Sequence, residues 1–286
     1  MLTSSGRLRF VLGPKHDVLE NAFYLGHVAA ATYTGVFGTD SDRIHPEQYP
    51  FYDQLQLLDP EVFEYLPLDA HGYIAEAAEH IVVAFRGSVS IQNWITNVRF
   101  EQRPVIIDNI PMGMIHAGFA EAFAPLCMPL RKALEEKLHT PKLLYITGHS
   151  LGGAMAILAA KWLQLIGLTV HGLVTFGSPR VGDAYFAASY PITCERWVNY
   201  QDPVVHVPPP ILFGQKYRHI GRMHYFDAAG KVNSEPSVWT QMRDQFSGLF
   251  TRNGLSTAQL TQSISQRLAD HDINSYLQKL ERHFPT

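Results

Sequence analysis

The GHSLGG segment at residues 148–153 constrains the fold of this chain more than any other. It follows a short apolar run rich in β-forming residues, 143–147, and leads into a helical pattern that ends near Ile166. In that setting a Gly-x-Ser-x-Gly sequence predicts a tight strand-to-helix turn that presents the Ser150 hydroxyl. Neighbouring backbone crowds such a turn, so it requires glycine, and the helix N-terminus favours negative charge beside it. We therefore predict that Ser150 is a nucleophile rather than part of an inert packing turn.

Three further runs have the same short, apolar, β-rich character: residues 81–85, 172–176 and 197–200. Strands that alternate with helices at this spacing predict a parallel sheet with right-handed crossovers. Near the start of the chain, Asp17 is placed to cap a helix with an apolar face. The chain is therefore predicted to be an α/β protein whose mostly parallel central sheet is flanked by helices.

Composition excludes several classes of protein. The chain has 286 residues, 46% of them hydrophobic, a net charge of −3 and no run of Lys and Arg, which argues against disorder and against nucleic-acid binding. No internal repeat or linker divides it, so one domain over residues 1–286 is expected. Cys127 and Cys194 belong to no metal-ligand pattern and are expected to be buried thiols, although a pairing stays open. No metal is expected.

The N-terminal residues do not read as a secretory leader, and no apolar run approaches the roughly 18 residues of a membrane span. We therefore expect no transmembrane segment. The compartment stays open between the cytoplasm and export without a standard leader.

A serine nucleophile needs a base and an acid that orients it, and with this turn the chain order is Ser, Asp or Glu, then His. Asp202 is the best placed acid, because it directly follows the 197–200 run. Two downstream histidines compete for the base. His224 lies in a β-like run, and His271 lies in a polar turn that opens a final helical pattern. Position alone does not choose between them.

Four blocks of sequence together resemble one known family. They are V-A-F-R-G-S at 83–88, I-H-A-G-F at 115–119, Y-I-T-G-H-S-L-G-G-A at 145–154 and T-F-G-S-P-R-V-G at 175–182. In their order and spacing the chain is similar to the class 3 (fungal-type, Rhizomucor/Thermomyces-like) lipases of the α/β-hydrolase superfamily. The resemblance extends from about Gly72 to Pro208. It implies the α/β-hydrolase fold, with a lid helix and a C-terminal helical insertion.

The resemblance also implies roles for individual residues. It makes Asp202 the acid of a catalytic triad and favours His271 over His224 as the base. It assigns Ser88 to the oxyanion hole, where the geometry of the turn independently places the Leu151 N–H group.

A lid is implied at residues 89–100. Within it, Ile91, Trp94, Ile95 and Val98 follow helical spacing on one apolar side. The same stripe is typical of a helix that simply covers the core, and only the resemblance makes a lid of it. Residues 209–270 form a divergent insertion, for which the sequence indicates no role.

The expected function is that of a serine carboxylic-ester hydrolase acting on acylglycerols, a triacylglycerol lipase, with no cofactor. Its expected partner is a lipid or ester substrate at an oil–water interface, with no obligate protein partner. Alternatives are a short-chain carboxylesterase, a phospholipase, a feruloyl esterase, a peptidase or amidase, and a non-catalytic binding protein of the same fold. The sequence sets neither acyl-chain length nor positional preference.

Overall fold

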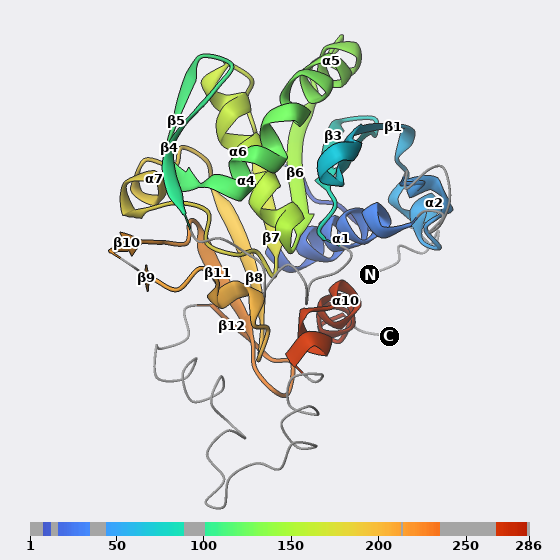
Figure 1. Cartoon of the computed structure of the whole chain (residues 1–286). Coiled ribbons are helices and arrows are strands. Elements are labelled where there is room, and N and C mark those ends of the chain that lie inside the picture. Colours follow the sequence, from blue (N-terminus) through green and yellow to red (C-terminus); the bar gives the residue numbers. More distant parts are fainter. Residues whose placement is uncertain are drawn as a thin grey trace, which may run out of the picture.

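An eight-stranded sheet in the order β1-β2-β3-β6-β7-β8-β11-β12 forms the centre of the molecule (Figure 1). This computed structural model describes residues 8–12, 17–34, 44–88, 101–212, 214–234 and 267–284. The strands of the sheet are β1 (Leu58–Tyr65), β2 (Ala70–Glu76), β3 (His80–Phe85), β6 (Leu143–His149), β7 (Gly172–Phe176), β8 (Cys194–Asn199), β11 (Arg222–Phe226) and β12 (Val232–Ser234). From β3 to β11 neighbouring strands run parallel, whereas β1, β2 and β12 are antiparallel additions at the two edges.

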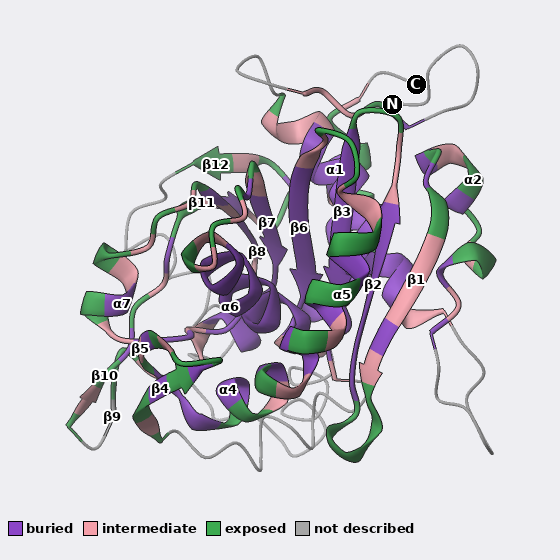
Figure 2. Ribbon diagram, turned by 90° about the horizontal axis from the view of Figure 1, so that it is seen from above, coloured by how far each residue is buried: buried purple, intermediate pink, exposed green. Residues whose placement is uncertain are grey.

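Helices cover both faces of this sheet, as Figure 2 shows from above. They are α1 (Val18–Ala30), α2 (Tyr52–Leu55), α4 (Ala117–Phe123), α5 (Cys127–Lys137), α6 (Leu151–Leu165), α7 (Ala184–Ala188) and α10 (Ile273–Glu281), with the short 3₁₀ helices η2 (Ala31–Tyr33) and η6 (Val204–His206) among the connections. The cap predicted for α1 is present, because the Asp17 side chain accepts hydrogen bonds from the N–H groups of Leu19 and Glu20.

The core is divided between the two faces of the sheet. On β3, Ile81, Val83 and Phe85 pack with α4, α5 and α6, while Val82 and Ala84 pack with α1 and α10. Because successive side chains of a strand point to opposite faces, a strand covered on both sides has no polar position. This confirms the interpretation of the apolar runs as buried strands of an α/β-hydrolase fold.

Two short hairpins lie outside the central sheet. They are formed by β4 (Gln102–Ile107) with β5 (Ile110–His116), and by β9 (Ile211–Leu212) with β10 (Gln215–Lys216). The expected insertion at 209–270 contains this second hairpin and also β11 and β12, which extend the sheet. Residues 235–266 and the expected lid at 89–100 lie outside the described residues.

Both thiols are buried and free, so Cys127 and Cys194 form no disulfide with each other.

Candidate active site

Ser150 lies at the turn between β6 and α6, where the backbone is strained. Its φ is +60° and its ψ is −131°, a conformation that non-glycine residues rarely adopt. The Ser150 N–H group donates to the Phe176 carbonyl oxygen on β7 at 2.9 Å, which holds the turn against the sheet. The side chain is buried, with only 1% of the residue exposed.

Asp202 and His271 form a buried pair beyond the carboxyl end of β8. The Nδ1 atom of His271 lies 2.9 Å from Asp202 Oδ1 and 2.8 Å from Oδ2. None of the Asp202 surface is exposed, and 3% of His271 is. A carboxylate in this position orients the imidazole and stabilises its protonated form.

Gly177 and Gly87 line the site closely, one against the Asp202–His271 pair and the other against Ser150. A Cβ atom on Gly177, next to the residue that binds the Ser150 N–H group, would lie 2.7 Å from Asp202 Oδ2 and 3.0 Å from the His271 ring. Gly177 also has a φ of +58°. On the other side, a Cβ atom on Gly87 would lie 2.9 Å from the Ser150 Cβ atom. Only glycine fits either position without moving the backbone.

Two polar atoms at the centre of this arrangement have no partner. The Ser150 Oγ atom and the His271 Nε2 atom are both buried, and neither has a hydrogen-bond partner within the described part of the chain. Most buried polar atoms are hydrogen-bonded, so an orphaned pair calls for an explanation. In unliganded active sites the bond between nucleophile and base is often long and tightens only around the substrate.

Tyr276 anchors the acid from α10. Its hydroxyl group donates to Asp202 Oδ2 at 2.6 Å and accepts from the Asn199 N–H group, and the Val204 N–H group donates to Asp202 Oδ1 at 2.8 Å. Tyr276 is not among the site residues expected from the sequence. Its spacing from His271 in the chain does not reveal this contact.

A second set of contacts joins the two sides of the site through His149. Its Nε2–H group donates to the His271 carbonyl oxygen at 2.7 Å, and its Nδ1 atom accepts from the Tyr33 hydroxyl group at 2.7 Å. The Gly87 N–H group in turn bonds the Tyr33 oxygen. Burial and then the charge of His271 keep the pKa of His149 well below its usual value, so its ring is neutral and this pattern of donors is stable.

The residues expected to bind an oxyanion lie at the same turn. Leu151 is the first residue of α6, where N–H groups have no acceptor within the helix. Ser88 directly follows Gly87, whose backbone is packed against the Ser150 turn. A negative charge between these two segments would lie at the positive end of α6.

His224, the other candidate for the base, is engaged on the opposite part of the sheet. Its Nε2 atom lies 2.5 Å from Glu195 Oε2, its Nδ1 atom lies 3.0 Å from the Ser234 hydroxyl oxygen, and its ring stacks on Trp197. Both ring nitrogens are therefore occupied, and neither partner belongs to the Ser150 turn.

Three further expectations concern the lid, a metal ion and a membrane span. Ile91, Trp94 and Ile95 of the expected lid lie outside the described residues. Within the described ranges no group of three or more His, Cys, Asp or Glu side chains is arranged to hold a metal ion. Every helix in the same ranges is too short or too polar to cross a bilayer.

Comparison with known proteins gives consistent matches. The family described as lipase (class 3) matches residues 82–212. The chain is 38% identical over 172 residues to secreted mono- and diacylglycerol lipase 1 of Fusarium solani, which covers 58% of this chain and 50% of that protein. It is 35% identical over 159 residues to the lipase of Rhizomucor miehei, covering 52% of this chain and 42% of that protein. The chain thus spans about half the length of these curated relatives.

The fold matches as well. The propeptide complex of Rhizomucor miehei lipase superposes with a TM-score of 0.63 and 26% identity, covering 83% of this chain and 79% of that one. The matched sequence includes the Ser150 turn and Asp202, and the matched fold is the parallel sheet that brings them together. Over residues 82–212 the chain is similar to the class 3, fungal-type lipases, and its fold is that of the α/β-hydrolase superfamily.

Proposed function

We propose that this chain is a serine carboxylic-ester hydrolase that acts on acylglycerols through Ser150, His271 and Asp202. One observation carries the proposal: among the described residues, neither the buried Nε2 atom of His271, whose Nδ1 atom pairs with Asp202, nor the Oγ atom of the strained Ser150 has a hydrogen-bond partner. An ester that enters this space completes both sets of bonds.

The chemistry follows from the geometry. His271 takes the proton from the Ser150 hydroxyl group while Asp202 holds its Nδ1–H group and stabilises the imidazolium. The Ser150 oxygen attacks the ester carbonyl carbon, the alcohol leaves with the proton from His271, and an acyl-enzyme remains. Water, activated by His271, then attacks the acyl-enzyme and releases the fatty acid. No step requires a metal or an organic cofactor.

The negative charge that develops on the carbonyl oxygen is met by the Leu151 and Ser88 N–H groups, with the Ser88 hydroxyl group as a third donor. Loss of one such donor typically costs about 10²–10³-fold in rate. The position of both residues at the N-terminus of α6 and against Gly87 supports this role.

Acylglycerols are the substrate class favoured by the relatives. The Fusarium solani protein is described as a secreted mono- and diacylglycerol lipase, and several other relatives are described as lipases. Ser150 and His271 are only 1% and 3% exposed, so a substrate reaches them only after a covering group moves. That burial supports a lid at residues 89–100 and action at an oil–water interface. The secreted relative likewise supports export of this chain.

The test is the loss of reactivity at Ser150. We expect Ser150→Ala to lower turnover of a p-nitrophenyl ester and of an emulsified triglyceride by about 10⁴–10⁶-fold, without loss of the thermal transition. A fluorophosphonate probe should label the parent chain at Ser150 alone.

Two histidine variants complete the experiment. His271→Ala should lose activity as Ser150→Ala does, because the base is gone. His224→Ala, which disturbs a contact with Glu195 far from the turn, should keep the activity of the folded protein. Near-parental turnover in Ser150→Ala, or a larger catalytic loss in His224→Ala than in His271→Ala, would show the assignment to be wrong.

A further inference from the structure

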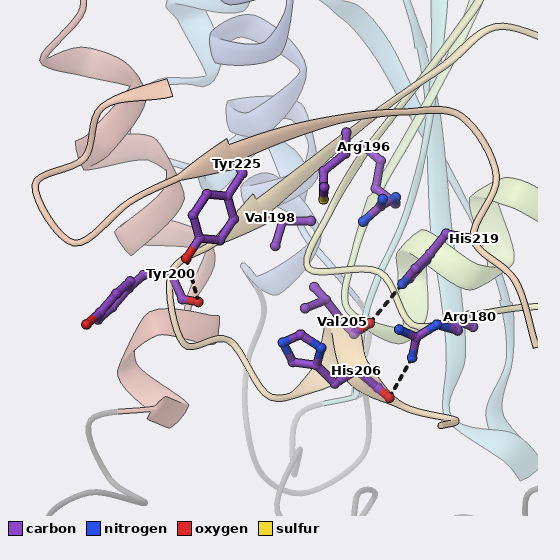
Figure 3. Close-up of a pocket in the computed structure, with 9 residues that line it drawn as sticks. Arg180, Arg196, Val198, Tyr200, Val205, His206, His219 and Tyr225 are labelled. Carbon is purple, nitrogen blue, oxygen red and sulfur yellow. Dashed lines mark hydrogen bonds between the residues drawn. The ribbon is translucent and has the colours of Figure 1, made fainter. Parts of the chain in front are cut away.

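A cavity lies beside the segment that carries Asp202, whose neighbours Tyr200, Val205 and His206 belong to its lining. This cavity of about 190 Å³ is lined by Arg180, Arg196, Val198, Tyr200, Val205, His206, His219, Met223 and Tyr225. Figure 3 shows the side chains of Arg196, from β8, and Arg180, from the loop after β7, extending toward the same space. None of the lining residues that the structure describes is acidic.

The side chains alternate along β8, and this explains why Arg196 enters the cavity. Trp197 packs on the side of α1 and α10, so Arg196 and Val198 point to the other face. Glu195 points away with Trp197 and is occupied by His224. The carboxylate that is nearest to Arg196 in sequence is therefore on the wrong face of the sheet.

Arg196 is buried, and no negatively charged side chain among the described residues pairs with it. Only 7% of the residue is exposed, its Nε atom has no hydrogen-bond partner, and no ion pair to it occurs among the described residues. Among the described residues, Arg180 donates to backbone carbonyl groups alone, from Nη1 to His206 at 2.6 Å and to Pro208 at 2.8 Å. A buried guanidinium normally has a carboxylate or another anion as partner, because desolvation of an unpaired charge is costly.

The two guanidinium groups also repel each other. Burial, followed by the charges of Arg196 and Arg218, lowers the pKa of Arg180 to about 10, which still leaves it protonated at neutral pH. Burial lowers the pKa of Arg196 to about 10 as well. Like charges brought together in a partly dry space raise the local potential and attract an anion.

The two histidines of the lining are neutral and add no charge of their own. Burial and the neighbouring arginines lower the pKa of His206 to about 4, although Asp202 acts in the opposite direction. The pKa of His219 is also well below its usual value, and its Nε2–H group donates to the Val205 carbonyl oxygen at 2.8 Å. The Tyr225 hydroxyl group donates to the Tyr200 carbonyl oxygen at 3.4 Å, so the charge of this lining comes from the two arginines (Figure 3).

We propose that this cavity binds a phosphate group, held by the guanidinium groups of Arg196 and Arg180. Two fixed positive charges match a doubly charged tetrahedral anion better than a single carboxylate, and guanidinium groups bind phosphate oxygens in pairs. The volume equals that of about six waters, which suits phosphate with a few bridging waters. It is smaller than the roughly 300 Å³ at which pockets for drug-sized ligands begin. This site is distinct from the proposed catalytic one and does not depend on its chemistry.

The test is calorimetric titration of the full chain with inorganic phosphate at constant ionic strength. We expect one saturable site in the parent chain and in Ser150→Ala. In Arg196→Gln the dissociation constant should rise at least about tenfold, because one charge-assisted contact is lost. The matched control is Arg222→Gln, an exposed arginine on the neighbouring strand β11, and it should bind phosphate as the parent does.

A second variant guards against loss of folding. Met223 is paired in register with Arg196 across the two strands, so Met223→Glu puts a carboxylate beside the guanidinium. We expect this variant to melt at or above the parental temperature without phosphate and to have lost phosphate binding. Competition by glycerol 3-phosphate would assign the site to esterified phosphate, and failure to compete would assign it to the free ion. No saturable binding by the parent up to about 10 mM, or unchanged binding by folded Arg196→Gln and Met223→Glu, would overturn the proposal.

Discussion

Ser150 combines a strained backbone with a side chain that has no hydrogen-bond partner among the residues that the structure describes, and the surrounding residues make both possible. The hydrogen bond from its N–H group to Phe176 holds the turn, and the absence of side chains at Gly87 and Gly177 leaves room for the reacting groups. Strain of this kind persists only where neighbouring structure enforces it, and such positions gather at functional sites. At this scale the chain devotes several residues to the precise placement of one hydroxyl group.

The tyrosine beneath the acid provides a prediction at the residue scale. Tyr276→Phe keeps the packed ring but removes the donor to Asp202 Oδ2 and the acceptor of the Asn199 N–H group. Hydrogen bonds to a charged group contribute about 1.5–3 kcal/mol, so we expect turnover to fall about tenfold or more. With one donor fewer, Asp202 attracts the protonated His271 more strongly. The acidic limb of the pH profile of kcat/KM should therefore move to higher pH.

The matched control is Tyr73→Phe on β2, which removes one buried hydroxyl group bonded to the Val28 carbonyl oxygen. It should lower the melting temperature without changing the pH profile. A parental profile in Tyr276→Phe would show that this hydroxyl group serves stability alone.

At the scale of elements, the site exists because the parallel strands end on the same edge of the sheet. β6 ends just before Ser150, β7 just before Gly177, and β8 three residues before Asp202. His271, which lies far from them in the sequence, is contributed by the segment just before α10. Residues that follow the carboxyl ends of parallel strands meet at one edge of the sheet because of the topology, even when they are far apart in the sequence. α10 carries Tyr276, which binds Asp202, and it packs on α1. This packing holds the start of α10, and with it His271, next to Asp202.

The proposed lid gives a prediction at this scale. If residues 89–100 open at an oil–water interface with Trp94 on the lipid side, Trp94→Ala should reduce hydrolysis of an emulsified triglyceride about tenfold more than that of a dissolved short-chain ester, since burial of an aromatic side chain in lipid is lost. Rates on the two substrates, measured side by side, check this. Asn93→Ala, on the polar side of the same stretch, serves as the control. An equal proportional loss on both substrates in Trp94→Ala would contradict the lid.

At the scale of the whole molecule, buried histidines make stability depend on pH. Burial lowers the pKa of His27 and of His80 to about 4, and that of His149 lies well below its usual value. The unfolded chain binds these protons below about pH 6.5 whereas the folded chain does not, so stability is full above that pH and falls as the pH drops toward 4. Asp270 opposes the trend near the acid end, because burial raises its pKa.

We therefore expect the midpoint of urea unfolding to fall steadily from pH 6.5 to pH 4.5, with each such histidine contributing up to about 1.4 kcal/mol per pH unit. Equilibrium unfolding at four pH values measures the slope. His80→Gln, which keeps a hydrogen-bonding group near the Tyr24 hydroxyl, should flatten it. A midpoint independent of pH over this range would refute the role of the buried imidazoles.

Local sequence determined the main strands of the sheet and the candidate nucleophile. Unbroken apolar runs require strands covered on both faces, which is why residues 81–85 and 143–147 could be recognised as buried strands. The Gly-x-Ser-x-Gly turn after such a strand identified Ser150, and Asp202 followed from its place just after the 197–200 run. These signals depend only on neighbours in the chain, so they are legible without a fold. The antiparallel strands β1, β2 and β12 were not predicted, because none of them has the unbroken apolar run of the parallel strands.

Tertiary structure alone decided the contacts that join distant segments. It placed His271 against Asp202 and occupied His224 with Glu195, a choice that position in the chain left open. It also revealed Tyr276 and His149 as supports of the site, and brought Arg180 and Arg196 into one cavity. Each contact joins residues that lie on different elements, and no local pattern encodes the distance between them. The physical reason is that these contacts depend on how the elements pack around the assembled sheet and not on neighbouring residues in the chain.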